Sequence, residues 1–134
     1  MRDIERELTP AMQKYQIGLL PYFPLASGLL TSKYRRGAEI PKDSRFAAWP
    51  RLADRYLNET NWKIVERLER FCARTGRSLL ELAFSWLACK PVVASVIAGA
   101  TKPEQVEQNV KAVNWKLSAE EMAEVDRITA KQGC

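Results

Sequence analysis

The residues best placed to do chemistry surround Gly99 and Thr101, between an apolar run and a segment with helical periodicity. Glycine lets the backbone turn tightly and approach a ligand closely. The free amides of a first helical turn attract phosphate, and Lys102 adds a positive charge. Polar side chains follow within two turns at Gln105, Gln108 and Asn109. The corner indicates an anion-binding site, with an ordinary capped connection between strand and helix as the alternative.

A second candidate is Tyr22, near the end of an earlier apolar run at residues 19–23. Pro24 and the small residues Ala26, Ser27 and Gly28 follow it. An aromatic ring at the C-terminal end of a strand can stack against a flat ligand ring. The alternative is a tyrosine that is buried in the core.

Positive charge is concentrated in residues 31–58, where seven basic side chains stand against three acidic ones, while the whole chain has a net charge of +5. A nucleic-acid binder usually spreads such charge along a helix or interleaves it with aromatic residues. We therefore expect no nucleic-acid partner. The segment is interpreted as a flap that faces an anionic ligand, with a solvated loop as the alternative.

Composition bounds the remaining chemistry. The 134 residues, 46% hydrophobic and 28% charged, are typical of one soluble domain, residues 1–134. Histidine is absent, which excludes a Ser-His-Asp hydrolase within this chain. The three scattered cysteines, Cys72, Cys89 and Cys134, favour free thiols over disulfides or a metal site. No apolar run approaches the roughly 20 residues of a membrane helix, so we expect a soluble, cytoplasmic protein with no membrane partner.

These candidates must be positioned by alternating strands and helices. Residues 4–15 have helical spacing, and Thr9 is expected as an N-cap before Pro10. Strands are expected at 19–23 and 92–97, and residues 25–58 show no sustained periodicity. Helical spacing returns at Thr60, with Gly76 as the expected C-terminal cap. The expected inner face of that helix consists of Trp62, Val65, Leu68, Phe71 and Cys72. Three Ser/Thr-x-x-Glu capping boxes, at Ser78, Thr101 and Ser118, predict helix starts. The inner faces of the two helices after the second strand are assigned to Val106, Val110, Val113, Met122, Val125 and Ile128. The order predicts an α/β fold with a parallel sheet, although two strands cannot close a barrel.

Two long motifs resemble those of the aldo-keto reductases. Residues 22–34 read Y-F-P-L-A-S-G-L-L-T-S-K-Y, similar to the family pattern Y-S-P-L-A-x-G-L-L-T-G-K-Y. Residues 96–109 carry V-I-A-G-A-T, Gln105 and Asn109, similar to V-I-P-G-A-x-x-x-x-Q-x-x-x-N. The similarity extends over essentially the whole chain and is strongest to the branch with potassium channel β subunits and bacterial reductases.

The resemblance implies the C-terminal portion of a (β/α)8 TIM barrel, its last two βα units and terminal helix, which in isolation would be predominantly helical. It also implies a nicotinamide dinucleotide, preferentially NADP (NADPH). By the family pattern Tyr22 would stack on the nicotinamide, and Lys33 and Arg45 would be the basic partners of the pyrophosphate. The pyrophosphate would run along Phe23, Pro24, Leu25, Ala26 and Ser27. The adenosine end would be held by Gly99, Thr101, Gln105, Gln108 and Asn109.

The chain also departs from the family. Phe23 replaces a serine, Ser32 a glycine and Ala98 a proline. The family's Asp, Tyr, Lys and His catalytic set is on earlier strands, so no catalytic residue is expected here. The implied activity is NADPH-dependent reduction of an aldehyde or ketone in an intact barrel, with this chain inactive alone. The alternative is a non-catalytic remnant that self-associates as a homo-oligomer through exposed strand edges.

Overall fold

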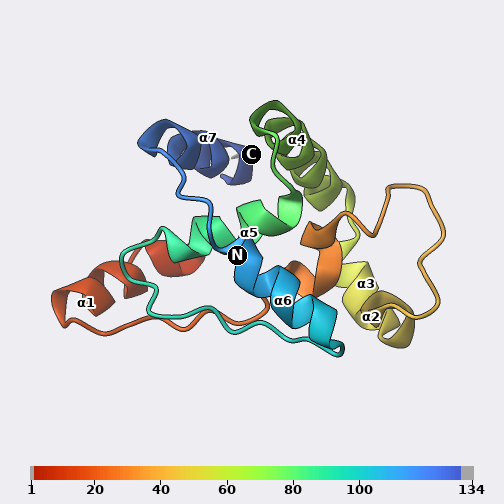
Figure 1. Cartoon of the computed structure of the whole chain (residues 1–134), viewed down its shortest axis with the longest axis horizontal. Coiled ribbons are helices and arrows are strands. Elements are labelled where there is room, and N and C mark those ends of the chain that lie inside the picture. Colours follow the sequence, from red (N-terminus) through yellow and green to blue (C-terminus); the bar gives the residue numbers. More distant parts are fainter. Residues whose placement is uncertain (1, 131–134) are drawn as a thin grey trace.

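The computed structural model describes residues 2–130, in which helices alternate with extended and irregular segments (Figure 1). Two short 3₁₀ segments, η1 and η2, accompany the α-helices. The elements in chain order are η1 (Asp3–Glu5), α1 (Leu8–Lys14), η2 (Ala26–Thr31), α2 (Arg45–Ala48), α3 (Pro50–Tyr56), α4 (Glu59–Thr75), α5 (Leu79–Ala88), α6 (Pro103–Ala112) and α7 (Ala119–Thr129).

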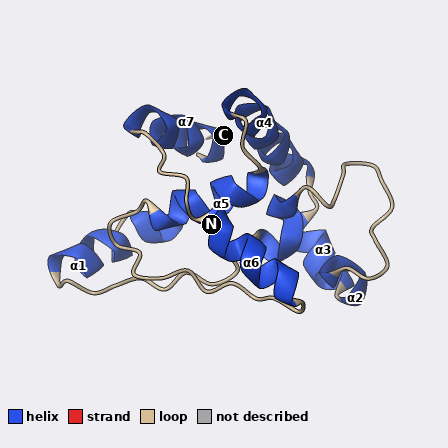
Figure 2. Ribbon diagram, viewed as in Figure 1, coloured by secondary structure: helices blue, strands red, loops and turns tan. Residues whose placement is uncertain are grey.

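The two expected strands pair in parallel, but only through isolated bridges. Leu19 pairs with Val93, and Tyr22 pairs with Ile97. Among residues 2–130 the two segments are drawn as loop rather than as strand arrows (Figure 2). The predicted parallel direction is therefore confirmed, and both bridges fall within the predicted strand ranges. The prediction of continuous strands is wrong, because Pro21 removes a donor and neither segment has a further strand beside it within the described chain.

The core lies around α4 and α5. The predicted inner face of α4 is confirmed, since Trp62, Val65, Leu68, Phe71 and Cys72 are all buried. The ring of Phe71 stacks on Trp115 with centroids 6.0 Å apart. Residues 31–58, here called the basic segment, add aromatic rings to this core. Tyr34 contacts Phe46, and Phe46 contacts Tyr56. The segment between 31 and 58 is thus anchored by its rings, while its charges remain outside.

The long helices begin and end where local signals predict. The side chains of Ser78 and Ser118 accept hydrogen bonds from the amides of Glu81 and Glu121, and the side chains of these glutamates accept hydrogen bonds from the N-cap amides. Gly76 ends α4 with φ of +66°, a conformation that glycine adopts without strain. Both capping boxes are confirmed, as are the buried positions of Val125 and Ile128.

Other predictions are wrong for identifiable reasons. Thr9 is not an N-cap, because α1 already begins at Leu8 and Pro10 occupies its first turn, where a missing N–H costs no helical bond. Residues 25–58 contain η2, α2 and α3, each too short to show a periodic pattern. The valines assigned to the inner face of α6 are exposed: Val106, Val110 and Val113. That face has no partner among the described residues.

Candidate functional site

The backbone brings Tyr22 and the Gly99 corner to the same edge. The N–H of Ile97 donates a 3.0 Å hydrogen bond to the carbonyl of Pro21, and Tyr22 is bridged to Ile97. Gly99 follows two residues later. Because the segments are parallel, both reach this edge with their C-terminal ends, where ligands bind in parallel α/β sheets. Tyr22 is not a core residue, since 72% of its surface is exposed.

The chain after Tyr22 folds into a tight turn with unusual backbone angles. Phe23, Ala26 and Ser27 have φ of +55°, +46° and +60°. Gly28 follows at +97°, a value that side-chain-bearing residues rarely adopt. The amide of Gly28 donates to the carbonyl of Leu25 at 2.8 Å. The amide of Ala26 likewise donates to the carbonyl of Phe23 at 3.0 Å, so the turn is held by its own backbone hydrogen bonds.

Both basic residues assigned to the pyrophosphate approach this turn. The guanidinium carbon of Arg45 lies 5.5 Å from the centre of the Phe23 ring. The Lys33 side chain lies directly over Gly28, where an added Cβ would be 2.6 Å from its Cε atom. Its ammonium group also lies 5.1 Å from the centre of the Tyr34 ring. Residues from the basic segment thus place two cations beside the backbone of residues 23–28.

The Gly99 corner is open. A Cβ built on Gly99 would meet no atom within 4 Å. Thr101 is not the N-cap of α6: the helix starts at Pro103 with Lys102 as N-cap, and no side chain caps it. Instead, both the amide and the hydroxyl of Thr101 donate to the Gln105 side-chain oxygen, at 2.8 and 3.2 Å. Gln108 is exposed and Asn109 half-buried on the same helix.

A model of the aldo/keto reductase family matches residues 1–130. The chain belongs to the aldo/keto reductase family. It is 43% identical over 113 residues to a probable voltage-gated potassium channel subunit beta of Oryza sativa subsp. japonica, covering 83% of this chain and 34% of that protein. It is 36% identical over 125 residues to the L-glyceraldehyde 3-phosphate reductase of Escherichia coli K12, covering 90% and 36%.

The structure also resembles a solved aldo/keto reductase. The match to the glycerol dehydrogenase of Gluconobacter oxydans has a TM-score of 0.74 and 32% identity, and covers 96% of this chain and 38% of that one. The predicted fold class is confirmed: the chain is part of a TIM barrel. It spans about a third of the length of the curated relatives that it matches.

Residues 2–130 contain no group of three or more His, Cys, Asp or Glu side chains that could hold a metal ion. Burial raises the pKa of the Cys72 thiol to about 11, with Glu69 and Glu81 adding to the shift, so this thiol stays protonated. Cys134 lies outside the described residues. No helix within residues 2–130 is both long and apolar enough to cross a membrane.

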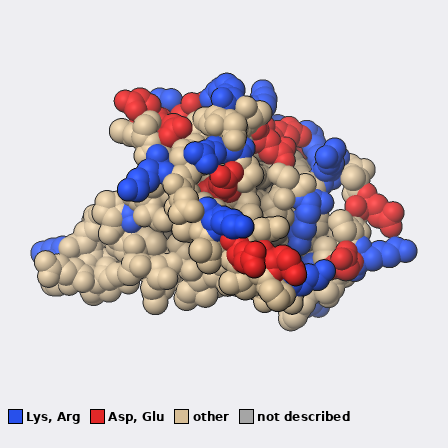
Figure 3. All heavy atoms as spheres, viewed as in Figure 1, with Lys and Arg blue, Asp and Glu red and all other residues tan. Residues whose placement is uncertain are grey.

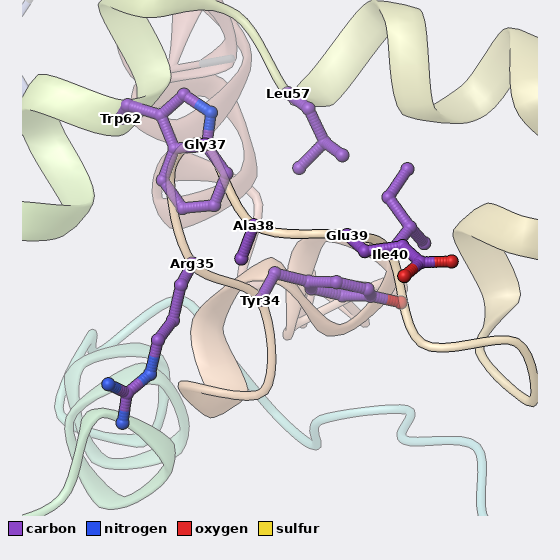
Figure 4. A pocket seen from close by; sticks show the side chains of 8 residues that line it. All are labelled: Tyr34, Arg35, Gly37, Ala38, Glu39, Ile40, Leu57 and Trp62. Atoms are coloured by element: carbon purple, nitrogen blue, oxygen red, sulfur yellow. The ribbon is translucent and has the colours of Figure 1, made fainter.

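A separate hollow of about 210 Å³ lies under the loop of residues 35–40 (Figure 4). Tyr34 and Trp62 form part of its wall. The Tyr34 ring is almost fully buried, and its hydroxyl has no hydrogen-bond partner among the described residues. Figure 4 shows this hydroxyl on the side of Glu39 and Ile40. Sequence reasoning missed the hollow, although Tyr34, the last residue of the first motif, lines it.

Proposed function

We propose that this chain carries the dinucleotide-binding corner of an NADPH-dependent aldo/keto reductase. The observation that carries the proposal is the parallel pairing of Tyr22 with Ile97, because it brings the tyrosine and the Gly99 corner to one edge. An extended nicotinamide dinucleotide has the nicotinamide ring at one end, a pyrophosphate in the middle and adenosine at the other end. The exposed ring, the turn with two cations and the open glycine corner suit these parts in that order.

The residues present fit such a ligand. The exposed Tyr22 ring is free to stack on a nicotinamide, and Arg45 and Lys33 supply charge for a pyrophosphate beside residues 23–28. The open space beside Gly99 admits the adenosine end. There, Gln105 would exchange its bond to the Thr101 amide for a bond to the ligand, with Gln108 and Asn109 one turn further along α6. The positive charge of the basic segment favours NADPH over NADH.

The reaction would be reduction of a carbonyl. NADPH held by these residues would supply the hydride for the carbonyl carbon of an aldehyde or ketone, and a proton donor elsewhere in the barrel would supply the proton for the oxygen, which gives an alcohol. This chain would orient the nicotinamide with Tyr22, but the residues that match the family motifs do not include the family's proton donor. We therefore expect binding without turnover by the 134-residue chain. A cytoplasmic location is part of the proposal, supported by the free thiols of Cys72 and Cys89.

Titration of NADPH fluorescence against the purified chain tests this proposal. Gly99→Val adds atoms to a space that the protein leaves empty, so it should weaken binding at least tenfold while the free energy of unfolding stays unchanged. Tyr22→Ala should also weaken binding. A matched control is Ala38→Val, at an exposed position in the wall of the separate hollow. The proposal fails if wild-type chain binds no NADPH, or if Gly99→Val binds as tightly as wild type.

Self-association is the second candidate function, favoured by the unpaired outer edges of the two extended segments. A homo-oligomer would cover these edges without any nucleotide. Size-exclusion chromatography with light scattering distinguishes the candidates. A stable dimer that binds no NADPH supports the interaction module, whereas a monomer that binds NADPH supports the reductase corner.

A further inference from the structure

The hollow under the loop of residues 35–40 is separate from the candidate nucleotide site. None of residues 22–28 or 99–109 lines it. Its volume is about 210 Å³. An apolar cavity of roughly 150 Å³ is large enough to hold benzene. A molecule with a single ring can therefore fit into this hollow.

The walls of the hollow are mostly apolar and aromatic. The Trp62 indole lies opposite Leu57 and Ile40 in the view of Figure 4. Trp62 is buried, and Leu57 and Ile40 pack against the core, so the fold holds these walls in place. Small-molecule sites typically have this composition, an apolar lining with a few polar groups that fix the orientation of the ligand.

The Tyr34 hydroxyl is the polar group that lacks an explanation. Only 4% of the surface of Tyr34 is exposed, and its hydroxyl oxygen has no hydrogen-bond partner among residues 2–130. A buried hydroxyl without a partner costs free energy, and the large majority of such groups in proteins are paired. Figure 4 shows this hydroxyl directed toward Glu39 and Ile40, which both line the hollow. A polar ligand atom in the hollow would therefore satisfy it.

The charges of the wall indicate which polar group fits. Glu39 and Arg35 both line the hollow, so the wall has one charge of each sign and favours a neutral ligand. The Arg35 guanidinium is directed away from Glu39 and from the Tyr34 hydroxyl (Figure 4). Tyr34 can donate to a ligand oxygen, whereas the Glu39 carboxylate can only accept. A hydroxyl group both accepts and donates, and it therefore suits this pair.

The loop over the hollow is attached to α4 through Arg36. Its Nη2 atom lies 2.6 Å from Oε2 of Glu59, and its Nη1 atom lies 3.5 Å from Oε1 of Glu66. Charged side chains of both signs gather over this right-hand part of the molecule (Figure 3). The two contacts of one guanidinium restrict the loop, so Glu39 is kept on the side of the Tyr34 hydroxyl.

We propose that the hollow under residues 35–40 binds a neutral single-ring molecule with a hydroxyl group, an alcohol or a phenol. The ligand hydroxyl accepts a hydrogen bond from Tyr34 and donates one to Glu39. The ring packs between Trp62 and Leu57. This site does not require a nucleotide, so its failure would leave the proposed function unchanged, and the reverse also holds.

Fluorine NMR titration of the purified chain with 4-fluorophenol tests the proposal, and 4-fluorotoluene is the matched probe without a hydroxyl. Wild type should bind 4-fluorophenol at least fivefold more tightly than 4-fluorotoluene. Tyr34→Phe should weaken the binding of 4-fluorophenol at least fivefold and leave that of 4-fluorotoluene unchanged. Because the Tyr34 hydroxyl has no partner within residues 2–130, this variant should not lower the free energy of unfolding in urea.

Two further variants locate the binding. Ala38→Leu adds atoms to the wall of the hollow at an exposed loop position, so the chain should fold and bind both probes at least tenfold more weakly. Trp49→Ala removes an exposed aromatic ring outside the hollow and should change neither affinity. The absence of saturable binding, equal affinity of wild type for the two probes, or 4-fluorophenol binding that Ala38→Leu leaves unchanged would each overturn the proposal.

Discussion

Asp126 Oδ1 accepts a 3.0 Å hydrogen bond from the indole N–H of Trp86, which joins α7 to α5. The same carboxylate forms ion pairs with Arg2 at 3.0 Å and Lys90 at 3.3 Å. Both cations also lie near the Trp86 ring, 5.0 and 4.4 Å from its centre. One carboxylate therefore connects the beginning of the described chain, the end of α5 and the last helix.

Replacing Asp126 should destabilise the fold by an amount that depends on which of these interactions the new residue keeps. Asp126→Asn keeps an acceptor for Trp86 but removes the charge, so the free energy of unfolding should fall by about 1 kcal/mol. Asp126→Leu also leaves the indole N–H unpaired and should cost about 2 kcal/mol or more. Glu124→Gln is the control, because Glu124 on the same helix pairs with Arg74 and not with Trp86. Urea denaturation measures all three; equal effects of Asn and Leu would contradict the role of the indole bond.

Close contact between Gly18 and Ala94 sets the spacing of the two parallel segments. A Cβ on Gly18 would be 2.7 Å from the Cβ of Ala94, and neither backbone can move without disturbing the Leu19–Val93 bridge. Gly18→Ala should therefore lower the free energy of unfolding by about 1–3 kcal/mol and weaken NADPH binding. Adding Ala94→Gly should restore both, as thermal unfolding and fluorescence titration would reveal. Failure of the double variant to recover would show that the contact is not the cause.

Sequence predicted the long helices because their signals are local. The serines that cap α5 and α7 and the glycine that ends α4 act within a few residues of the helix end, so tertiary contacts did not override them. The site segments were also found locally, since Tyr22 and Gly99 each stand where an apolar run meets a turn. Their pairing in parallel followed from the alternation of strands and helices.

The features that the sequence predicted wrongly depend on contacts that the pattern of neighbouring residues does not contain. The spacing of Val106, Val110 and Val113 shows that α6 has an apolar face, but not whether the partner belongs to this chain. Helix α6 starts at Pro103, one residue later than a cap at Thr101 predicts, because proline favours the first helical position. The Gln105 side chain accepts the hydrogen bond from the Thr101 amide, and the sequence motif alone does not predict this bond.

Burial protects the Cys72 thiol from reagents. Its pKa is raised to about 11 by desolvation and by nearby Glu69 and Glu81, so almost no thiolate exists at pH 8. Iodoacetamide labelling resolved by peptide mass spectrometry should modify Cys89 at least tenfold faster than Cys72 in the folded chain. In urea the two rates should converge. Fast labelling of Cys72 in buffer would contradict its buried position.

Arg45 should contribute to nucleotide affinity through charge as well as through its contact with Phe23. Arg45→Gln removes the cation 5.5 Å from the centre of the ring, and we expect NADPH affinity to fall about tenfold. Arg51→Gln, an exposed arginine of the same basic segment on α3, is the control and should have a small effect. Fluorescence titrations at two salt concentrations measure both, and equal losses would assign the effect to net charge alone.

The capping box at the start of α5 should make stability depend on pH. Hydrogen bonds from the Ser78 amide and hydroxyl, and the nearby Arg77, hold the pKa of Glu81 below its ordinary value of 4.5. Because the folded pKa is the lower one, Glu81 contributes stability above pH 4.5, and this contribution is lost as the pH falls through the folded pKa. Urea denaturation between pH 6 and pH 3 should show a shallower loss in Glu81→Gln than in wild type. Glu107→Gln, an exposed position on α6, is the control; identical slopes in wild type and Glu81→Gln would contradict the linkage.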